Sequence, residues 1–308
     1  MQAFYALLLL FSTAFACPPP PSNHQVNSDV VGDEWANLTY DDASVINFKW
    51  YEHDSQNLCS ATCDLEVPDT QGFNLGWCHH KGLSSKGKYK LASIGNSFAA
   101  NHGNLFYQEC GFKAKSILQG SANGCEPLYP STSSQVCRDH VKAVVERVEK
   151  EKPDYAFIFT RYISIGDLTD ESDFAKDPIY QFMKRQMLKL TANIKYKLYI
   201  MDALPQIHQF LDVAAELKKV SDPVEFDKVY VILEPTYQMA RKRHAQLVKD
   251  CNGKCELIDY TPLFFNQTTQ TYRFFDEKGL AYYTGHFHMS PHGLEHVRPF
   301  WKDFCAKL

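Results

Sequence analysis

The amino-acid sequence predicts an α/β fold: a three-layer α/β/α sandwich in which helices cover both faces of a mostly parallel sheet. Three observations indicate it. Short apolar runs alternate with amphipathic stretches from residue 89 to the C-terminus, the order that parallel sheets require. The runs are apolar throughout, as strands are when both faces of the sheet are covered. Hydrophobic residues make up 44% of the chain and charged residues 22%, which is a globular composition.

Five apolar runs are the predicted strands. Each is short, rich in aliphatic and aromatic residues, and bounded by polar or turn-forming residues. They are Tyr89–Ile94, Ala114–Leu118, Tyr155–Thr160, Lys197–Asp202 and Cys255–Asp259. In open α/β sheets, ligands bind beyond the carboxyl ends of the strands, so we expect a site in the segments that follow these runs.

Amphipathic stretches between and after the strands are the predicted helices. In one of them Val141, Val144 and Val148 recur at helical spacing, with charged residues on the opposite face. A helix also begins at Ser97, a final helix covers 293–305, and a short one lies within 39–53. The remaining predicted helices are Cys137–Lys150, Pro178–Lys195, His208–Val220 and Thr236–Cys251.

The first sixteen residues resemble a signal peptide. Ala3–Ala16 is apolar but too short to cross a bilayer core of about 30 Å as a helix. It ends in a small-x-small cleavage pattern at Ala14-Phe15-Ala16, directly before a proline run. Asn37 and Asn266 each begin a glycosylation acceptor pattern. We therefore expect a secreted or lumenal glycoprotein with no membrane span after signal cleavage.

An exported protein enters an oxidising compartment, so its ten cysteines are expected to form disulfides. Residues 17–87, rich in Cys, Pro, Asn and Ser, are expected to be a disulfide-tied extension, mostly loop, before an α/β domain at 88–308. Cys251 and Cys255 flank a turn and are a plausible local bridge. One cluster of cysteines and histidines could instead bind zinc, because thiolates and imidazoles are zinc ligands. It consists of Cys59, Cys63, Cys78, His79 and His80.

The charge balance excludes some partners. A formal net charge of −4 provides no basic field for nucleic acid, so we expect no nucleic-acid partner.

The segment after the first predicted strand carries the first candidate catalytic residue. Gly95 allows a sharp turn, and Ser97 then begins a helix. A hydroxyl there lies beside unpaired N–H groups and the positive end of the helix dipole, which are the donors that an oxyanion needs. Two roles remain open for Ser97, a nucleophile or a helix N-cap.

A histidine near the C-terminus is the candidate partner. Ser290 and Pro291 form an N-cap and first-turn proline for the last helix, which places His288 in the loop entering it. Triads are defined by geometry, so a serine and a histidine 191 positions apart can meet at the same edge of a sheet. The same segment leaves an alternative open, in which His286, His288 and His292 hold a hydrolytic zinc ion.

These motifs, in this order, resemble the SGNH (GDSL-like) hydrolases, and most closely the extracellular SGNH domain associated with membrane acyltransferases. The stretches that carry the resemblance are KYKLASIGNSFAANHG at 88–103, YQECGFKAKSILQGSANGCEPLYP at 107–130, KPDYAFIFTRYISIGD at 152–167 and HMSPHGLEHVRP at 288–299. The resemblance implies an SGNH-hydrolase or flavodoxin-like sandwich, with Ser97 as nucleophile and His288 as general base. Its implied chemistry is ester hydrolysis or acyl transfer, often of O-acetyl groups on carbohydrate.

The sequence departs from the family pattern at two places. An aspartate normally stands three residues before the histidine, and here that position is Gly285. Asp202 and Asp276 are candidates for the missing carboxylate, and a Ser-His dyad is a third possibility. The family's Gly-x-Asn-Asp oxyanion block is replaced by Thr160-Arg161-Tyr162. Asn96, Asn101 and Arg161 are therefore the residues predicted to bind the oxyanion or substrate.

The sequence thus predicts a secreted serine esterase or O-acyltransferase acting on acyl esters, without a cofactor. If it transfers acyl groups, its donor would come from a separate membrane acyltransferase. An inactive SGNH-fold module that binds glycan or protein is the alternative, favoured by the glycine at 285 and by the missing Gly-x-Asn-Asp block.

Overall fold

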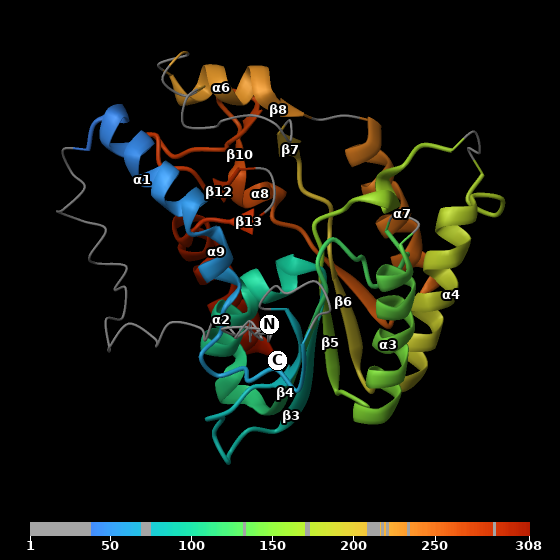
Figure 1. The fold of residues 1–308 in the computed structure, drawn as a ribbon. Helices are drawn as coiled ribbons and strands as arrows, with labels where there is room; N and C mark the ends of the chain where they lie inside the picture. The colour runs from blue at the N-terminus through green and yellow to red at the C-terminus, as the bar shows by residue number, and fades with distance from the viewer. Residues whose placement is uncertain are drawn as a thin grey trace, which may run out of the picture.

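The computed structural model describes residues 38–68, 75–131, 134–169, 173–207, 216, 219, 222–232, 235–285 and 288–308. The predicted signal peptide and Asn37 lie outside the described residues. So does the predicted helix at 208–220, apart from Glu216 and Lys219. In the described part, the predicted α/β fold is confirmed (Figure 1).

The central sheet has seven strands in the order β1-β2-β4-β3-β5-β6-β9, and β4, β3, β5, β6 and β9 run parallel. These five are the predicted strands, with ends that shift by three residues at most: β3 (Tyr89–Gly95), β4 (Ala114–Ser121), β5 (Tyr155–Phe159), β6 (Lys197–Met201) and β9 (Cys255–Ile258).

Two antiparallel strands extend the sheet at one edge. β2 (Gly76–His79) pairs with β4, and β1 (Val67–Pro68) pairs with β2. Both come from residues 17–87, so the expectation that this segment is mostly loop is wrong for them. A four-residue strand of Gly, Trp, Cys and His has too little apolar pattern to stand out from loop.

The helices agree with the predicted ranges where they are described. Helix α9 is longer than predicted at both ends, and α6 and α8 were not predicted. The helices are α1 (Tyr40–Glu52), α2 (Ser97–Cys110), α3 (Gln135–Glu151), α4 (Pro178–Asn193), α6 (Pro223–Tyr230), α7 (Pro235–Asp250), α8 (Thr261–Phe264) and α9 (Pro291–Lys307). The short 3₁₀ segments are η1 (Asp54–Leu58), η2 (Gly111–Lys113) and η3 (Ser164–Gly166). The remaining strands form two-residue pairs: β7 (Gln206–Ile207) with β8 (Val231–Ile232), β10 (Phe265–Asn266) with β11 (Thr271–Tyr272), and β12 (Tyr283–Thr284) with β13 (His288–Met289).

Helices cover both faces of the sheet, which gives three layers. Along β5, Phe157 and Phe159 enter the core beneath α2 and α9, whereas Ala156 and Ile158 enter the core beneath α3, α4 and α7. Figure 1 shows α3, α4 and α7 on one side of the sheet and α2 and α9 on the other. Because successive side chains of a strand point to opposite faces of the sheet, each strand contributes residues to both apolar cores.

Four disulfides join described residues: Cys63–Cys78, Cys110–Cys305, Cys125–Cys137 and Cys251–Cys255. The last is the predicted local bridge, and Cys110–Cys305 joins α2 to α9. The Cys63–Cys78 bond corrects the zinc alternative for this cluster, because zinc binds thiolates and these two sulfurs are bonded to each other. No helix of the described residues is long and apolar enough to span a membrane.

A histidine lies in the core beneath α2. The His102 side chain is fully buried against the rings of Phe98, Phe159 and Tyr260, and its Nδ1–H donates to the Phe98 carbonyl at 3.0 Å. Burial lowers the pKa of His102 to about 3, because the apolar surroundings disfavour the charged imidazolium.

We expect His102 to make the protein less stable in acid. In the unfolded chain a histidine takes up a proton below about pH 6.5, whereas folded His102 stays neutral, so stability falls as pH falls. Between about pH 6.5 and about pH 5 this costs about 2 kcal/mol. In His102→Phe, urea unfolding should show a smaller loss of stability over this range. His53→Gln, an exposed control, should keep the wild-type loss, and an unchanged loss in His102→Phe would contradict the prediction.

Candidate active site

The turn between β3 and α2 presents Ser97 at the carboxyl end of the central strand. Gly95 passes so close to β5 that a Cβ there would lie 1.7 Å from the Phe159 carbonyl oxygen, which only glycine avoids. Asn96 is the N-cap of α2, since its Oδ1 accepts from Phe98 N at 3.1 Å. Ser97 is therefore the first helical residue and its hydroxyl is not the cap.

Asn96 also joins this turn to the end of β5. Its Nδ2 donates to the Arg161 carbonyl at 2.7 Å, and Arg161 N donates to Asn96 Oδ1 at 3.2 Å. The Arg161 guanidinium is buried and lies over the Tyr283 ring, 5.4 Å from its centroid. Asn96 and Arg161, both predicted from the sequence, thus lie at the same edge of the sheet.

His288 reaches Ser97 from the C-terminal part of the chain. It lies in β13, whose pairing with β12 places Thr284 opposite His288. His288 Nε2 is 2.8 Å from Ser97 Oγ. The serine and histidine that the sequence nominates are therefore hydrogen-bonded, although the histidine lies in a short strand and not in a loop.

A carboxylate that the sequence did not reveal completes the arrangement. Asp54 Oδ2 lies 2.5 Å from His288 Nδ1, and Asp54 Oδ1 accepts a hydrogen bond from the Thr284 hydroxyl. A carboxylate only accepts, so it selects the tautomer with the proton on Nδ1. His288 Nε2 is then free of its own proton and accepts from the Ser97 hydroxyl.

Asp54 is the first residue of η1, directly after α1, and is 234 positions from His288. No local motif marks it, so the sequence offered no signal. The two aspartates considered instead have other partners. Asp202 lies 3.0 Å from His244 Nδ1, and Asp276 lies 3.1 Å from His292 Nε2.

The glycine at 285 has a backbone reason. Gly285 has φ +73° in the turn between β12 and β13, a conformation that an aspartate adopts only with strain. A Cβ there would lie 3.5 Å from the Tyr51 ring of α1, which is an ordinary contact distance. The positive φ is therefore the reason for the glycine, and the carboxylate reaches His288 from the neighbouring segment that carries α1 and η1.

Asn101 fixes the strand that carries His288. Its Nδ2 donates to the Met289 carbonyl at 3.1 Å, and Met289 N donates to Asn101 Oδ1 at 3.0 Å. Asn101 lies one helical turn after Ser97, so the same helix holds the nucleophile candidate and grips the strand of its partner. The oxyanion or substrate roles of Asn96, Asn101 and Arg161 stay predictions.

The histidine-zinc alternative involves residues with other contacts. His288 uses one ring nitrogen toward Ser97 and the other toward Asp54, His292 pairs with Asp276, and His286 lies outside the described residues. Within the described ranges, one group of three has metal-ligand spacing, Cys63, Cys78 and His80, and its two cysteines are disulfide-bonded.

Comparison with known proteins identifies a family. The family model described as "SGNH domain (fused to AT3 domains)" matches residues 62–303. No curated protein matches the chain.

Two solved structures are similar to the chain. One is the periplasmic domain of a lipopolysaccharide acetyltransferase from Salmonella ser. Paratyphi A, with 13% identity, a TM-score of 0.55, and coverage of 82% of this chain and 93% of that chain. The other is described as a "putative platelet activating factor from Streptococcus pneumonia", with 12% identity, a TM-score of 0.40, and coverage of 85% and 92%. The first likeness agrees with the predicted SGNH-type α/β fold.

We expect Asn101→Leu to destabilise the protein. The leucine has a similar size but leaves the buried N–H and C=O of Met289 without their amide partner, which costs about 2–3 kcal/mol. Gln108→Leu, an exposed change on the same helix, should alter stability by less than about 0.5 kcal/mol. Urea unfolding of both variants measures the difference, and equal effects would contradict the prediction.

Proposed function

This chain belongs to the SGNH domain family of the type fused to AT3 domains, and we propose that it is a serine esterase or O-acyltransferase acting on acyl esters. The proposal rests on one observation, the hydrogen-bonded series Asp54–His288–Ser97 at the carboxyl edge of the sheet. In this proposal Ser97 and His288 are the catalytic residues, and Asp54 is a positioning residue that acts through His288.

The reaction begins at the Ser97 hydroxyl. His288 Nε2 takes its proton while Ser97 Oγ attacks the acyl carbonyl, forming a tetrahedral intermediate. The intermediate expels the alkoxide, which takes the proton from His288, and an acyl-serine remains. Water or an acceptor hydroxyl then attacks the acyl-serine, giving its proton to His288. Collapse returns the proton to Ser97 and releases an acid in hydrolysis or a new ester in transfer.

The oxyanion needs donors near Ser97. The backbone N–H of Ser97 is the first candidate, since N–H groups in the first turn of a helix have no acceptor within that helix. The second candidate donor is the guanidinium of Arg161, a residue that lies just after the neighbouring strand β5. Asn96 and Asn101 are kept as weaker candidates, because their amides bond the backbone of Arg161 and Met289.

The proposed acyl group is acetyl and the proposed substrate an acetylated carbohydrate. The similarity to a domain whose printed name is that of a lipopolysaccharide acetyltransferase supports this choice. The family description supports a separate membrane acyltransferase as partner, if the reaction is transfer. Between hydrolysis and transfer, we favour hydrolysis. We also propose that the protein is secreted or lumenal, which the signal-like N-terminus and the glycosylation acceptor sites Asn37 and Asn266 support.

An inactive binding module was the alternative that the sequence left open. Two departures favour it: Gly285, which removes the usual carboxylate beside His288, and the missing Gly-x-Asn-Asp block. Asp54 accepts a hydrogen bond from His288 Nδ1, so the first departure no longer favours an inactive module over an enzyme.

We expect Ser97→Ala to lose both hydrolysis of p-nitrophenyl acetate and labelling by a fluorophosphonate. The loss should be on the order of 10³-fold or more, because no other group replaces the nucleophile. Ser55→Ala, at an exposed serine beside Asp54, is the control and should retain both. A wild-type protein that neither hydrolyses acetyl esters nor reacts with the fluorophosphonate would refute the proposed function.

We expect Asp54→Asn to lower kcat by about 10²–10⁴-fold with little change in KM, because an amide at this place stabilises the wrong tautomer of His288. Asp41→Asn, an exposed change in the first turn of α1, should leave kcat unchanged. Steady-state kinetics on the same ester measure both variants. A kcat for Asp54→Asn equal to that of the wild type would leave Ser97 and His288 as a dyad.

A further inference from the structure

The carboxylate of the proposed site comes from a segment outside the part of the chain that matches the family. The match begins at residue 62, whereas Asp54 precedes it. Residues 40–63, called the N-terminal arm below, comprise α1, η1 and the residues up to Cys63. The position of Asp54 therefore depends on how this arm is held against the remainder of the molecule.

Apolar packing alone does not fix the arm. The buried residues of α1 are Ala43, Ser44 and Asn47, which are small or polar. Of its large apolar side chains, Val45 and Phe48 are 52% and 47% exposed. The Trp50 ring stacks on His292 with 6.3 Å between ring centroids, and the half-exposed Tyr51 ring lies beside Gly285. Hydrophobic burial is also non-directional, so a contact face of this kind needs directional bonds to set its register.

Asn47 supplies two such bonds. Its side chain is 6% exposed; Nδ2 donates to the Gly279 carbonyl and Oδ1 accepts from Ala281 N, each at 2.8 Å. The residues that it grips lie directly before β12, the strand that carries Thr284 and pairs with the strand of His288. Asn47 thus fixes the arm to the same piece of chain that carries the imidazole.

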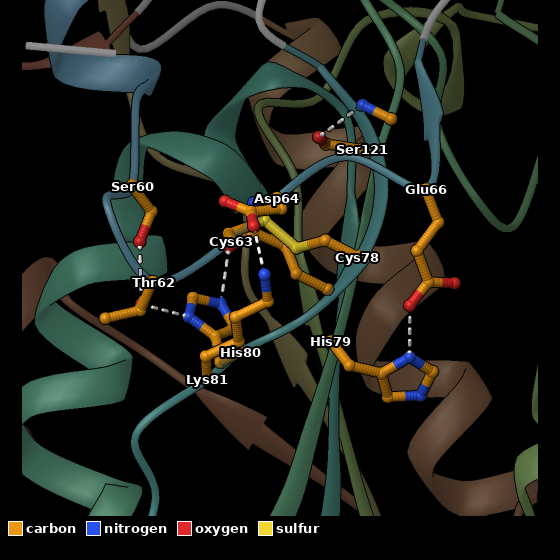
Figure 2. Close-up of a disulfide and its surroundings, with 12 residues drawn as sticks. Ser60, Thr62, Cys63, Asp64, Glu66, Cys78, His79, His80, Lys81 and Ser121 are labelled. Atoms are coloured by element: carbon orange, nitrogen blue, oxygen red, sulfur yellow. Dashed lines mark hydrogen bonds and ion pairs between the residues drawn. A yellow bond between two sulfur atoms is a disulfide. The ribbon is translucent and has the colours of Figure 1, made fainter. Parts of the chain in front are cut away.

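The far end of the arm is fixed separately. Asn104 of α2 donates its Nδ2 hydrogen bond to the Cys59 carbonyl at 2.7 Å, and the Cys63–Cys78 disulfide joins the arm to β2. Figure 2 shows this disulfide beside the Thr62–His80 and Asp64–Lys81 contacts. These contacts tie the arm to the sheet and to the Ser97 helix, and Asn47 adds two buried hydrogen bonds to the backbone just before β12.

We propose that Asn47 is a positioning residue for the reaction, which acts by holding Asp54 against His288. This inference rests on the proposed function, since it assigns Asn47 an effect through Asp54. It makes the N-terminal arm a working part of the site and gives a buried polar residue outside the family match a role in turnover.

The test is a double-mutant cycle on p-nitrophenyl acetate hydrolysis. Asn47→Ala should lower kcat about 10-fold with little change in KM, because a small displacement of a reacting group costs rate and not ester binding. In Asp54→Asn, where the carboxylate is already lost, adding Asn47→Ala should lower kcat by less than about 2-fold. Lys49→Ala, exposed on the same helix, should leave kcat unchanged in both backgrounds.

A stability measurement separates positioning from folding. Urea unfolding of Asn47→Ala shows whether the variant is folded under the assay conditions, and a folded Asn47→Ala with the kcat of the wild type would overturn the inference. An equal loss from Asn47→Ala in both backgrounds would show a general structural effect and overturn the inference while leaving the proposed function intact. Wild-type protein without turnover or fluorophosphonate labelling would instead refute the proposed function, and the inference with it.

Discussion

A histidine that takes a serine proton at Nε2 needs an acceptor at Nδ1, and in this chain that acceptor has to come from outside the histidine's own turn. Gly285 has φ +73°, a left-handed conformation that side chains other than glycine rarely adopt, so the turn before His288 does not suit an aspartate. The N-terminal arm therefore has to pack beside β12 to bring Asp54 to the imidazole. The face of α1 that is buried in this packing is small and polar, and consists of Ala43, Ser44 and Asn47.

Three buried asparagines each bond the backbone of a segment that is distant in the sequence. Asn96 bonds the N–H and C=O of Arg161, Asn101 bonds those of Met289, and Asn47 bonds a carbonyl and an N–H on either side of residue 280. A carboxamide offers one donor side and one acceptor side, as a peptide group does, so it can replace a missing neighbour in a ladder. Because both sides of each amide are used, the elements around Ser97 and His288 are held at fixed distances and not merely in contact.

Local patterns in the sequence were enough to predict the central strands and to single out Ser97 and His288 as a candidate pair. The strands are apolar runs, and Ser290 with Pro291 marks the start of α9, so each signal lies within a few residues of what it predicts. Asp54 and β2 have no such signal, because each is defined by a partner far along the chain. Asp54 lies 234 positions from His288, so in the sequence nothing distinguishes it from an aspartate on the surface.

Likeness of fold and completeness of a site are separate questions in this protein. The family match covers the sheet, the serine and the histidine, but it begins after the residue that orients the imidazole. A fold hosts active and inactive members alike, so the match by itself leaves Gly285 as a reason to doubt catalysis. The contact between Asp54 and His288 removes that reason, since a carboxylate that accepts from Nδ1 orients the imidazole whichever part of the chain supplies it.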